Sequence, residues 1–403
     1  MEYIQPGSRQ YASAIIALFL GSFVTFAELY STQPLIPVLT KEFGVSPATA
    51  SLTLSVSTGF LAFFLFIVSL FSDRLKRKRT MTFALLLSGL LSVGAALCHR
   101  LEPLLVIRAL QGIVLAGFPS IAMAYISEEF HSSRLGTVIG IYISGTSVGG
   151  MAGRLVVGAL SDYFTWHVAI GMLGVISLTF GGLFWILLPE SKYQTSNVKS
   201  RRSIHVFRLL KDRRLLALYA ISFLLMGAFV SLFNFISFPL LAPPYELSQT
   251  LVSSIFVVYL MGTLSSAWMG KLTDRMPHSK VIAIAIALML TGACVTISMP
   301  LLLKIIGVSL FTFGFFGAHS VASGWVGKLA APDQKAQASS IYLLFYYAGS
   351  SMMSPIGGLV WSRFGWSGLV GYTGLLLLIA GTLSVVVSRS HRAAARQQKA
   401  ELG

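Results

Sequence analysis

The sequence predicts an all-α membrane protein with twelve transmembrane helices in two six-helix bundles, and three observations support this fold class. Of the 403 residues, 55% are hydrophobic and only 11% are charged, whereas soluble chains carry roughly 25% charged residues. The apolar residues gather in runs long enough to cross a bilayer core about 30 Å thick. The positive charges, which give a formal net charge of +16, fall in short clusters between these runs.

Twelve apolar runs are the candidate spans. Their length and their lack of strict apolar–polar alternation exclude the strands of a membrane barrel. The first run has no small-residue cleavage site after a short core, so we interpret it as a retained span and not as a signal peptide. In chain order the runs are 12–38, 49–71, 80–98, 104–126, 135–160, 167–188, 215–241, 249–270, 280–300, 303–327, 337–360 and 367–388.

The distribution of lysine and arginine predicts the orientation of these spans. With the N-terminus inside, 24 of the 30 Lys and Arg residues lie in cytoplasmic segments and only four lie in outer connections. Such a bias follows the positive-inside rule, so we expect both termini in the cytoplasm. The same layout explains the net charge as a topology signal, which excludes nucleic acid as a partner.

A polar, cation-rich stretch between the sixth and seventh runs predicts the domain boundary. We expect an N-terminal six-helix bundle over 1–190, a cytoplasmic linker over 191–214, and a C-terminal bundle with a cytoplasmic tail over 215–403. Internal repetition supports this division. A shift of about 200 residues matches Asp73-Arg74 with Asp274-Arg275, Tyr142 with Tyr342, Gly149 with Gly349, Gly158 with Gly358, Phe164 with Phe364 and Trp166 with Trp366.

The loop after the second run resembles a signature of the major facilitator superfamily. The family pattern is G-x-x-x-D-R-x-G-R-R/K, and the segment 69–78 keeps Asp73, Arg74, Arg77 and Lys78. It departs from the pattern at both glycines, which are Ser69 and Lys76 in this chain. Together with twelve spans in two halves, the resemblance covers the whole chain. It implies a secondary transporter that works by alternating access, and members of this family are mostly monomeric.

Two further motifs resemble proton-coupled members of the same family. Arg108-Ala109-Leu110-Gln111-Gly112 is similar to the family's R-x-x-Q-G signature, and the fifth run keeps the glycine spacing of the drug–proton antiporter branch at Gly136, Gly145, Gly149 and Gly153. Gly150 and Arg154 replace a proline and a glycine of that pattern. The segments 149–155 and 30–37 look most similar to the YnfM-like exporter group.

Four ionisable residues lie well inside the predicted spans, where a charge is costly and therefore a functional candidate. They are Glu28, Arg108, Arg154 and His319. A carboxyl group that faces a cavity open to either side in turn can carry a proton across, which makes Glu28 the candidate for proton coupling. By the resemblance, Arg108 is its natural partner, and the alternative is that Glu28 only neutralises a buried arginine. His319 is either a proton relay or a hydrogen-bonded packing residue.

Candidate substrate-binding residues are Arg154, Tyr30, Met226, Phe233 and Asn234. The guanidinium group of Arg154 offers a fixed fork of donors for an anionic or polar substrate. It also lies near the outer end of its span, where it could extend toward water or hold a structural carbonyl or carboxylate. The three residues of the seventh run could line an apolar pocket, although packing within the bundle explains them equally.

Candidate gating residues lie in the two Asp-Arg loops and in the fifth run. By the resemblance, Asp73, Arg74 and Arg77, with Asp274 and Arg275 in the second copy, latch the halves on the cytoplasmic side. The alternative for the loop cations is a purely topological role. Gly149 and Gly153 allow close helix approach, which suits either a hinge or tight packing.

The leading hypothesis is a bacterial inner-membrane transporter that couples protons to export of small, partly apolar compounds. The alternative is a transporter of an organic anion, sugar or metabolite with Arg154 as the substrate anchor. An enzyme or sensor is disfavoured because the sequence has no nucleophile-and-base constellation, no His-Glu-x-x-His motif and no P-loop. We therefore expect no cofactor and no metal, and the expected partners are a small-molecule substrate, protons and the lipid bilayer.

Overall fold

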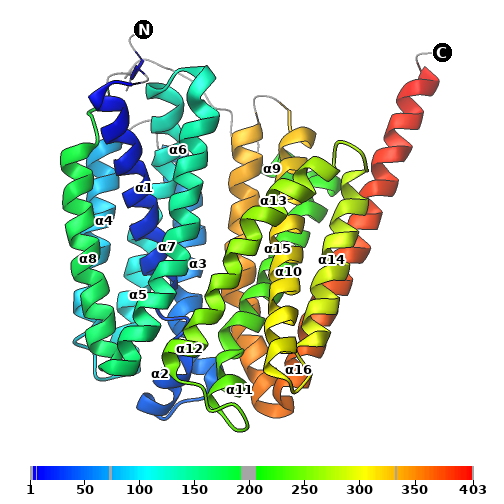
Figure 1. Cartoon of the computed structure of the whole chain (residues 1–403). Coiled ribbons are helices and arrows are strands. Elements are labelled where there is room, and N and C mark those ends of the chain that lie inside the picture. The colour runs from blue at the N-terminus through cyan, green and yellow to red at the C-terminus, as the bar shows by residue number, and fades with distance from the viewer. Residues whose placement is uncertain (1–2, 6, 72–74, 192–205, 332–333, 402–403) are drawn as a thin grey trace. The chain divides into compact units, whose positions relative to one another are not determined.

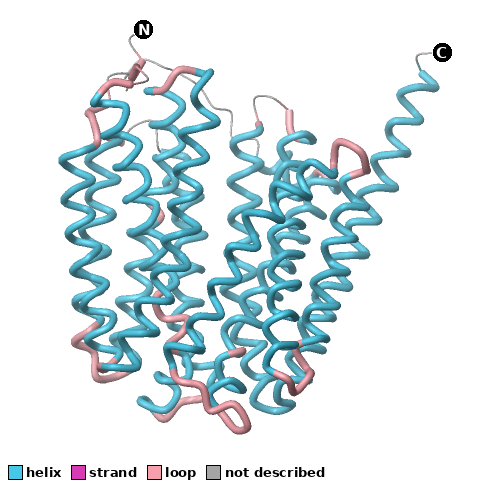
Figure 2. The backbone as a smooth tube through the Cα atoms, in the orientation of Figure 1, coloured by secondary structure: helices cyan, strands magenta, loops and turns pink. Residues whose placement is uncertain are grey.

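Helices account for nearly all of the described chain (Figures 1 and 2). The structure is a computed structural model that describes residues 3–5, 7–71, 75–191, 206–331 and 334–401. No strand occurs within these ranges. The prediction of an all-α chain is therefore confirmed.

Among the residues that the structure describes, ten segments are long and apolar enough to cross a membrane. They are Arg9–Tyr30, Pro47–Ser69, Leu101–Glu129, Leu135–Tyr163, Trp166–Leu187, Arg213–Leu241, Gln249–Leu272, His278–Val295, Leu301–Leu329 and Gln337–Val385. Two features explain why ten segments are found where twelve spans were predicted. The helix over the predicted span 80–98 begins with three consecutive cations at Arg77 and lies outside the ten. The predicted spans 337–360 and 367–388 lie in two helices that meet at the non-helical residue Gly365, and these count as the single segment Gln337–Val385 among the ten.

The residues form two compact units. Unit 1 comprises Met1–Ser200 and Ser237–Phe256, and unit 2 comprises Arg201–Ile236 and Val257–Gly403. A segment of the second half of the sequence, Ser237–Phe256, therefore belongs to the unit built from the first half. The sequence repeat alone did not predict this exchange.

Unit 1 contains the helices that position most of the candidate site. They are α1 (Arg9–Tyr30), α2 (Ile36–Phe43), α3 (Pro47–Phe71), α4 (Arg77–Ala95), α5 (Leu101–Leu115), α6 (Gly117–Glu129), η2 (Ser132–Arg134), α7 (Leu135–Tyr163), α8 (Trp166–Leu187), α11 (Ser237–Leu241) and α12 (Gln249–Ser254).

Local chemistry sets several of these helix ends. The Ser8 and Thr165 hydroxyls accept bonds from the first turns of α1 and α8, because the first N–H groups of a helix lack partners within it. The predicted first run, 12–38, is broken where α1 ends at Tyr30. A series of turns then leads into α2, which has Pro37 in its first turn.

Glycines bring α7 close to α1. A Cβ atom at Gly149 would overlap the backbone of Phe23, and one at Gly153 would overlap Ala27. Only glycine permits this separation between the two helix backbones. The contacts of these two predicted gating residues are therefore those of tight helix packing within unit 1.

Unit 2 contains α9 (Val206–Lys211), α10 (Arg213–Phe235), α13 (Leu260–Leu272), α14 (His278–Val295), α15 (Leu301–Leu329) and α16 (Lys335–Glu401). The short 3₁₀ segment η3 (Ile255–Tyr259) connects α12 to α13. A Cβ atom at Gly349 of α16 would overlap the backbone of Phe223 in α10. This contact repeats the Gly149–Phe23 contact of unit 1 at a shift of 200 residues, as expected for duplicated halves.

Candidate functional site

Glu28 is fully buried in α1, and serine and glutamine side chains from other helices surround its carboxyl group. The Ser92 hydroxyl of α4 donates a hydrogen bond to Oε2. Gln111 Nε2 of α5 lies 3.5 Å from the same oxygen and 2.8 Å from Ser92 Oγ. Ser177 Oγ of α8 lies beside the carboxyl group. Within the described chain, neither this hydroxyl nor Glu28 Oε1 completes a hydrogen bond. One carboxyl oxygen is thus well bonded, and a hydroxyl that can donate or accept lies beside the carboxyl group.

Arg108 of α5 is directed mainly at backbone carbonyl groups. Its Nε donates to Thr53 O (2.9 Å), Nη1 donates to Glu28 O (3.1 Å) and Nη2 donates to Leu29 O (2.6 Å). Two of these carbonyls lie at the C-terminal end of α1, where the helix dipole is negative and carbonyls lack partners within the helix. Arg108 is 1% exposed.

Gln111 connects Arg108 to the Glu28 carboxyl group. Arg108 Nη1 donates to Gln111 Oε1 at 2.7 Å, and the amide nitrogen of Gln111 faces Glu28 and Ser92. In the described structure, no ion pair joins Arg108 directly to the Glu28 carboxylate. The partnership suggested by the motif is therefore indirect. The motif itself contained the signal for Gln111, whereas Ser92 and Ser177 stand in apolar runs without any distinctive pattern.

Arg154 of α7 lies in a second buried site of unit 1, and the structure brings it together with Tyr30. Arg154 Nε donates to Gln33 Oε1 at 2.6 Å, and Nη1 donates to the carbonyl of Gly150. Its guanidinium carbon lies 4.1 Å from the centre of the Tyr30 ring and 5.1 Å from that of Phe256. A cation between two aromatic faces is stabilised by their quadrupoles.

The remaining candidates lie in unit 2. His319 Nδ1 is 3.0 Å from the Tyr342 hydroxyl, and its ring lies 4.5 Å from that of Tyr346. The Asn234 amide donates to Ser354 Oγ. Phe233 packs against other rings of α10 and η3, and Met226 is buried in α10.

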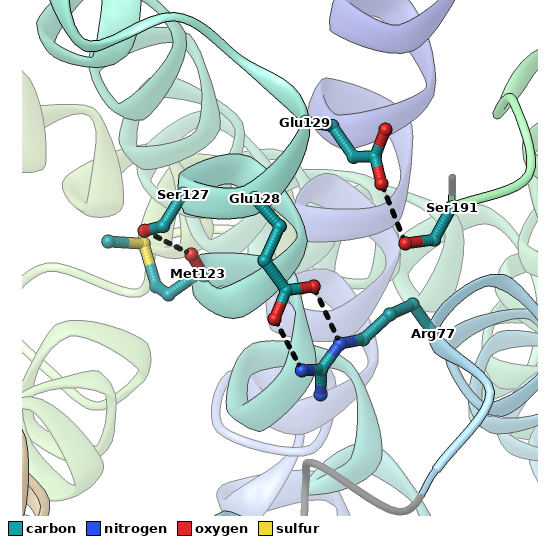
Figure 3. Close-up of polar contacts among 6 residues, drawn as sticks. All are labelled: Arg77, Met123, Ser127, Glu128, Glu129 and Ser191. Atoms are coloured by element: carbon teal, nitrogen blue, oxygen red, sulfur yellow. Dashed lines mark hydrogen bonds and ion pairs between the residues drawn. The ribbon is translucent and has the colours of Figure 1, made fainter. Parts of the chain in front are cut away.

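A charged cluster forms where α4 begins and α6 ends (Figure 3). Arg77 Nη2 and Nε bind the two carboxylate oxygens of Glu128 at 2.7 and 3.2 Å. This predicted gating residue therefore forms a bidentate ion pair, in which Arg77 is only 2% exposed and Glu128 is 31% exposed. Beside it, the Ser191 hydroxyl donates to Glu129 Oε1 at 2.7 Å (Figure 3).

The other predicted gating residues divide into two groups. Asp73 and Arg74 lie outside the described residues. Asp274 and Arg275, at the end of α13, have exposed side chains. Sequence reasoning missed Glu128, although its position in the acidic pair at the end of α6, near the cationic loop, was a usable signal.

Comparison with known proteins agrees with the fold and with the motifs. The Major Facilitator Superfamily profile matches residues 18–323 and 236–402. An uncharacterized MFS-type transporter, YybF of Bacillus subtilis (strain 168), is 45% identical over 97% of both chains. The inner membrane transport protein YnfM of Escherichia coli (strain K12) is 40% identical over 97% of this chain and 93% of its own length.

Among solved structures, a bacterial homolog of the human lysosomal transporter Spinster has a TM-score of 0.80. It is 16% identical, and the alignment covers 96% of this chain and 98% of that one. This likeness shows the fold. Together with the two sequence relatives, it confirms the predicted transporter class and the similarity to YnfM. The chain belongs to the major facilitator superfamily and is a multi-pass membrane transporter, not an enzyme.

Proposed function

We propose that this protein is a proton-coupled secondary transporter that exports small, partly apolar compounds by alternating access. It acts as a monomer in the bacterial inner membrane with both termini in the cytoplasm. Its twelve spans form two six-helix halves, 1–190 and 215–403, joined by the linker 191–214. The carrying observation is the fully buried Glu28 carboxyl group, which accepts a hydrogen bond from Ser92 at one oxygen and lies beside the Ser177 hydroxyl.

Both protonation states of Glu28 can be accommodated by this arrangement. A serine hydroxyl donates to a carboxylate and accepts from a carboxylic acid, so Ser177 can adapt by rotating its hydrogen. Burial disfavours the charged carboxylate, and a nearby cation favours it. Arg108 lies close to Glu28, but its N–H groups donate to backbone carbonyl groups and to the Gln111 side chain. Glu28 is therefore not locked in a permanent ion pair, which is what a residue that loads and releases a proton requires.

The remaining site residues have subordinate roles in this proposal. Arg108 and Gln111 hold Glu28 in place, and His319 with Tyr342 provides a second proton-exchanging pair in unit 2. Phe233, Asn234 and Met226 contact the substrate. At the cytoplasmic end, Arg77, with Glu128, belongs to the latch formed with Asp73, Arg74, Asp274 and Arg275. Gly149 and Gly153 hold α7 against α1.

The test is the Glu28→Gln variant, after thermal shifts of the purified protein across organic cations, organic anions and sugars have identified a ligand. Proteoliposomes then report accumulation driven by a pH gradient and exchange of labelled ligand without a gradient. We expect Glu28→Gln to retain exchange and to lose gradient-driven accumulation. The matched control is Glu102→Gln, because Glu102 is exposed at the start of α5. Unchanged accumulation by Glu28→Gln would remove Glu28 from the coupling mechanism.

One observation favours a second candidate function, transport of an organic anion, sugar or metabolite. Arg154 is buried, donates to the Gln33 amide oxygen and the Gly150 carbonyl, and lies over the rings of Tyr30 and Phe256. A guanidinium group presents a fixed fork of donors that suits an anionic or polar substrate group. Loss of organic-anion thermal shifts in Arg154→Ala, with intact shifts by cations, would support this candidate. Organic-anion thermal shifts that are equal in Arg154→Ala and in the wild type would exclude it.

A further inference from the structure

Two histidines, His99 and His167, lie side by side at one end of unit 1. His99 belongs to the short connection between α4 and α5, and His167 belongs to the first turn of α8. The centres of their rings are 5.2 Å apart, and the ring planes are tilted by 40°. The fold thus brings together two side chains that are far apart in the sequence and that commonly bind transition metals.

The ring of His167 is held in place by two contacts. It stacks on the buried ring of Trp166, with 3.8 Å between the ring centres. Its Nε2 lies 3.1 Å from the backbone carbonyl oxygen of Cys98. Because a carbonyl oxygen only accepts hydrogen bonds, Nε2 carries the proton and donates it. The lone pair of the neutral ring is therefore on Nδ1, which is the nitrogen that can bind a metal ion.

A histidine that binds a metal usually makes this kind of hydrogen bond. Its other ring N–H is donated to a carboxylate, a water or a backbone carbonyl, which fixes both the tautomer and the orientation of the ring. Trp166 is itself fixed, because its ring packs edge-on against Phe43. His99 is exposed, so an ion from solvent can reach the pair.

The separation of the two rings fits one shared metal ion. A histidine nitrogen lies about 2.0–2.1 Å from a bound Zn²⁺, which puts the ring centre about 3.2 Å from the metal. Two rings at the tetrahedral angle on one ion then have centres about 5.2 Å apart. The separation of His99 and His167 has this value.

The protein supplies two ligands at this place. The part of the chain that the structure describes contains no group of three or more His, Cys, Asp or Glu side chains placed to hold a metal ion. The thiol of the neighbouring Cys98 is directed instead at the Gly94 carbonyl oxygen, 3.7 Å away. Two histidines alone form an open site, in which water completes the tetrahedron, as at zinc sites that keep a position for water or substrate.

We propose that His99 and His167 form a binding site for Zn²⁺. Imidazole nitrogens suit zinc and its neighbours among the transition metals, whereas Mg²⁺ and Ca²⁺ prefer oxygen ligands. The bound ion joins the connection between α4 and α5 to the first turn of α8. The sequence predicted no metal, because no recognised motif links the two histidines. This inference goes beyond the proposed function, and it requires neither proton coupling at Glu28 nor knowledge of the substrate.

Isothermal titration of the full-length protein in detergent with ZnCl₂ tests the site, after removal of any affinity tag that contains histidine. We expect one Zn²⁺ per chain, and no binding of MgCl₂. His99→Ala and His167→Ala should each weaken Zn²⁺ binding about tenfold or more, because losing even a group that only orients a metal ligand costs 10–100-fold in affinity. As a second measurement, Zn²⁺ at about one hundred times its Kd should raise the Tm of the wild type by roughly 5 °C.

His278 supplies the matched control. It is half-buried and its ring stacks on that of Trp325, with 5.4 Å between the ring centres. Its Nε2 lies 3.1 Å from the Lys328 ammonium nitrogen, a cation that disfavours a metal ion at this place. His278→Ala should therefore leave the affinity for Zn²⁺ unchanged.

The exposed position of His99 keeps the test decisive. If His167→Ala fails to yield folded protein because its ring no longer packs on Trp166, His99→Ala decides the outcome alone. The proposal would be overturned if the wild type did not bind Zn²⁺, or if His99→Ala bound Zn²⁺ as tightly as the wild type. An equal loss of affinity in His278→Ala would overturn it as well.

Discussion

Replacing Arg108 with alanine tests whether this arginine anchors the end of α1 or instead adjusts the charge of Glu28. The substitution removes three hydrogen bonds to buried backbone carbonyls and a fourth to Gln111. A buried polar group left without a partner costs about 1–3 kcal/mol. The loss is partly offset because a charged group no longer has to be buried.

The expected net loss for Arg108→Ala is about 3–5 kcal/mol, the usual result of removing one member of a buried charged network. Thermal unfolding of the purified protein in detergent should show a decrease in Tm of roughly 5 °C or more, since each kcal/mol shifts the Tm of a large chain by about 2 °C. Arg108→Lys keeps the charge but lacks the planar fork, so its Tm should lie between those of Arg108→Ala and the wild type.

Arg100→Ala is the control, because the Arg100 side chain is 81% exposed and its contact with Glu102 is a surface pair. Such pairs contribute about 1 kcal/mol or less. The anchoring role would be refuted if Arg108→Ala unfolded at the wild-type temperature while the pH dependence of transport changed. That result would mean that the charge of Arg108 acts on Glu28 and that its carbonyl contacts are dispensable.

Three further substitutions test other contacts of the structure by thermal or chemical unfolding. Glu128→Gln removes the charge paired with buried Arg77 and should lower the free energy of unfolding by about 1–2 kcal/mol. This is less than for a fully buried ion pair, because Glu128 is 31% exposed. An unchanged free energy of unfolding would mean that the pair does not stabilise the fold. Gly149→Ala forces a methyl group into the α1 backbone and should cost about 1–3 kcal/mol, whereas Gly140→Ala should not destabilise. Burial raises the pKa of Asp212, but hydrogen bonds and the charge from the first turn of α10 lower it more, so its net pKa lies below the usual value. The ionised Asp212 side chain should therefore stabilise the fold fully at neutral pH, where Asp212→Ala should lower the free energy of unfolding by about 1 kcal/mol. This difference in free energy from the wild type should shrink as the pH falls below about 4, because Asp212 becomes protonated. A difference that stays constant with pH would contradict this assignment.

Sequence reasoning succeeded where local composition decides the structure. The apolar runs predicted nearly every helix, because a backbone surrounded by lipid must satisfy its hydrogen bonds within the segment. Glu28, Arg108 and Arg154 were recognised as buried ionisable residues for the same reason. The break after Tyr30 was not predicted, since the apolar run continues through residues that form turns.

Contacts between helices required the tertiary structure. The R-x-x-Q-G motif indicated that Arg108 matters, but not that its donors bind the carbonyls at the end of α1. Arg77 is one of five cations in a short loop, and nothing in the pattern distinguished it as the member buried against Glu128. These outcomes depend on the rotation and crossing of helices that are distant in sequence.

The sequence by itself determined the membrane class, the α-helical spans, the internal repeat and the family, because these depend on length, hydrophobicity and short motifs. The tertiary structure alone decided that residues 237–256 pack with the first half of the chain and that Phe256 covers Arg154. The physical reason is that these contacts are a few single hydrogen bonds, the close approach of Gly158 to Ser253, and the packing of Arg154 on the rings of Tyr30 and Phe256. Each involves residues more than 80 positions apart, for which local composition carries no signal.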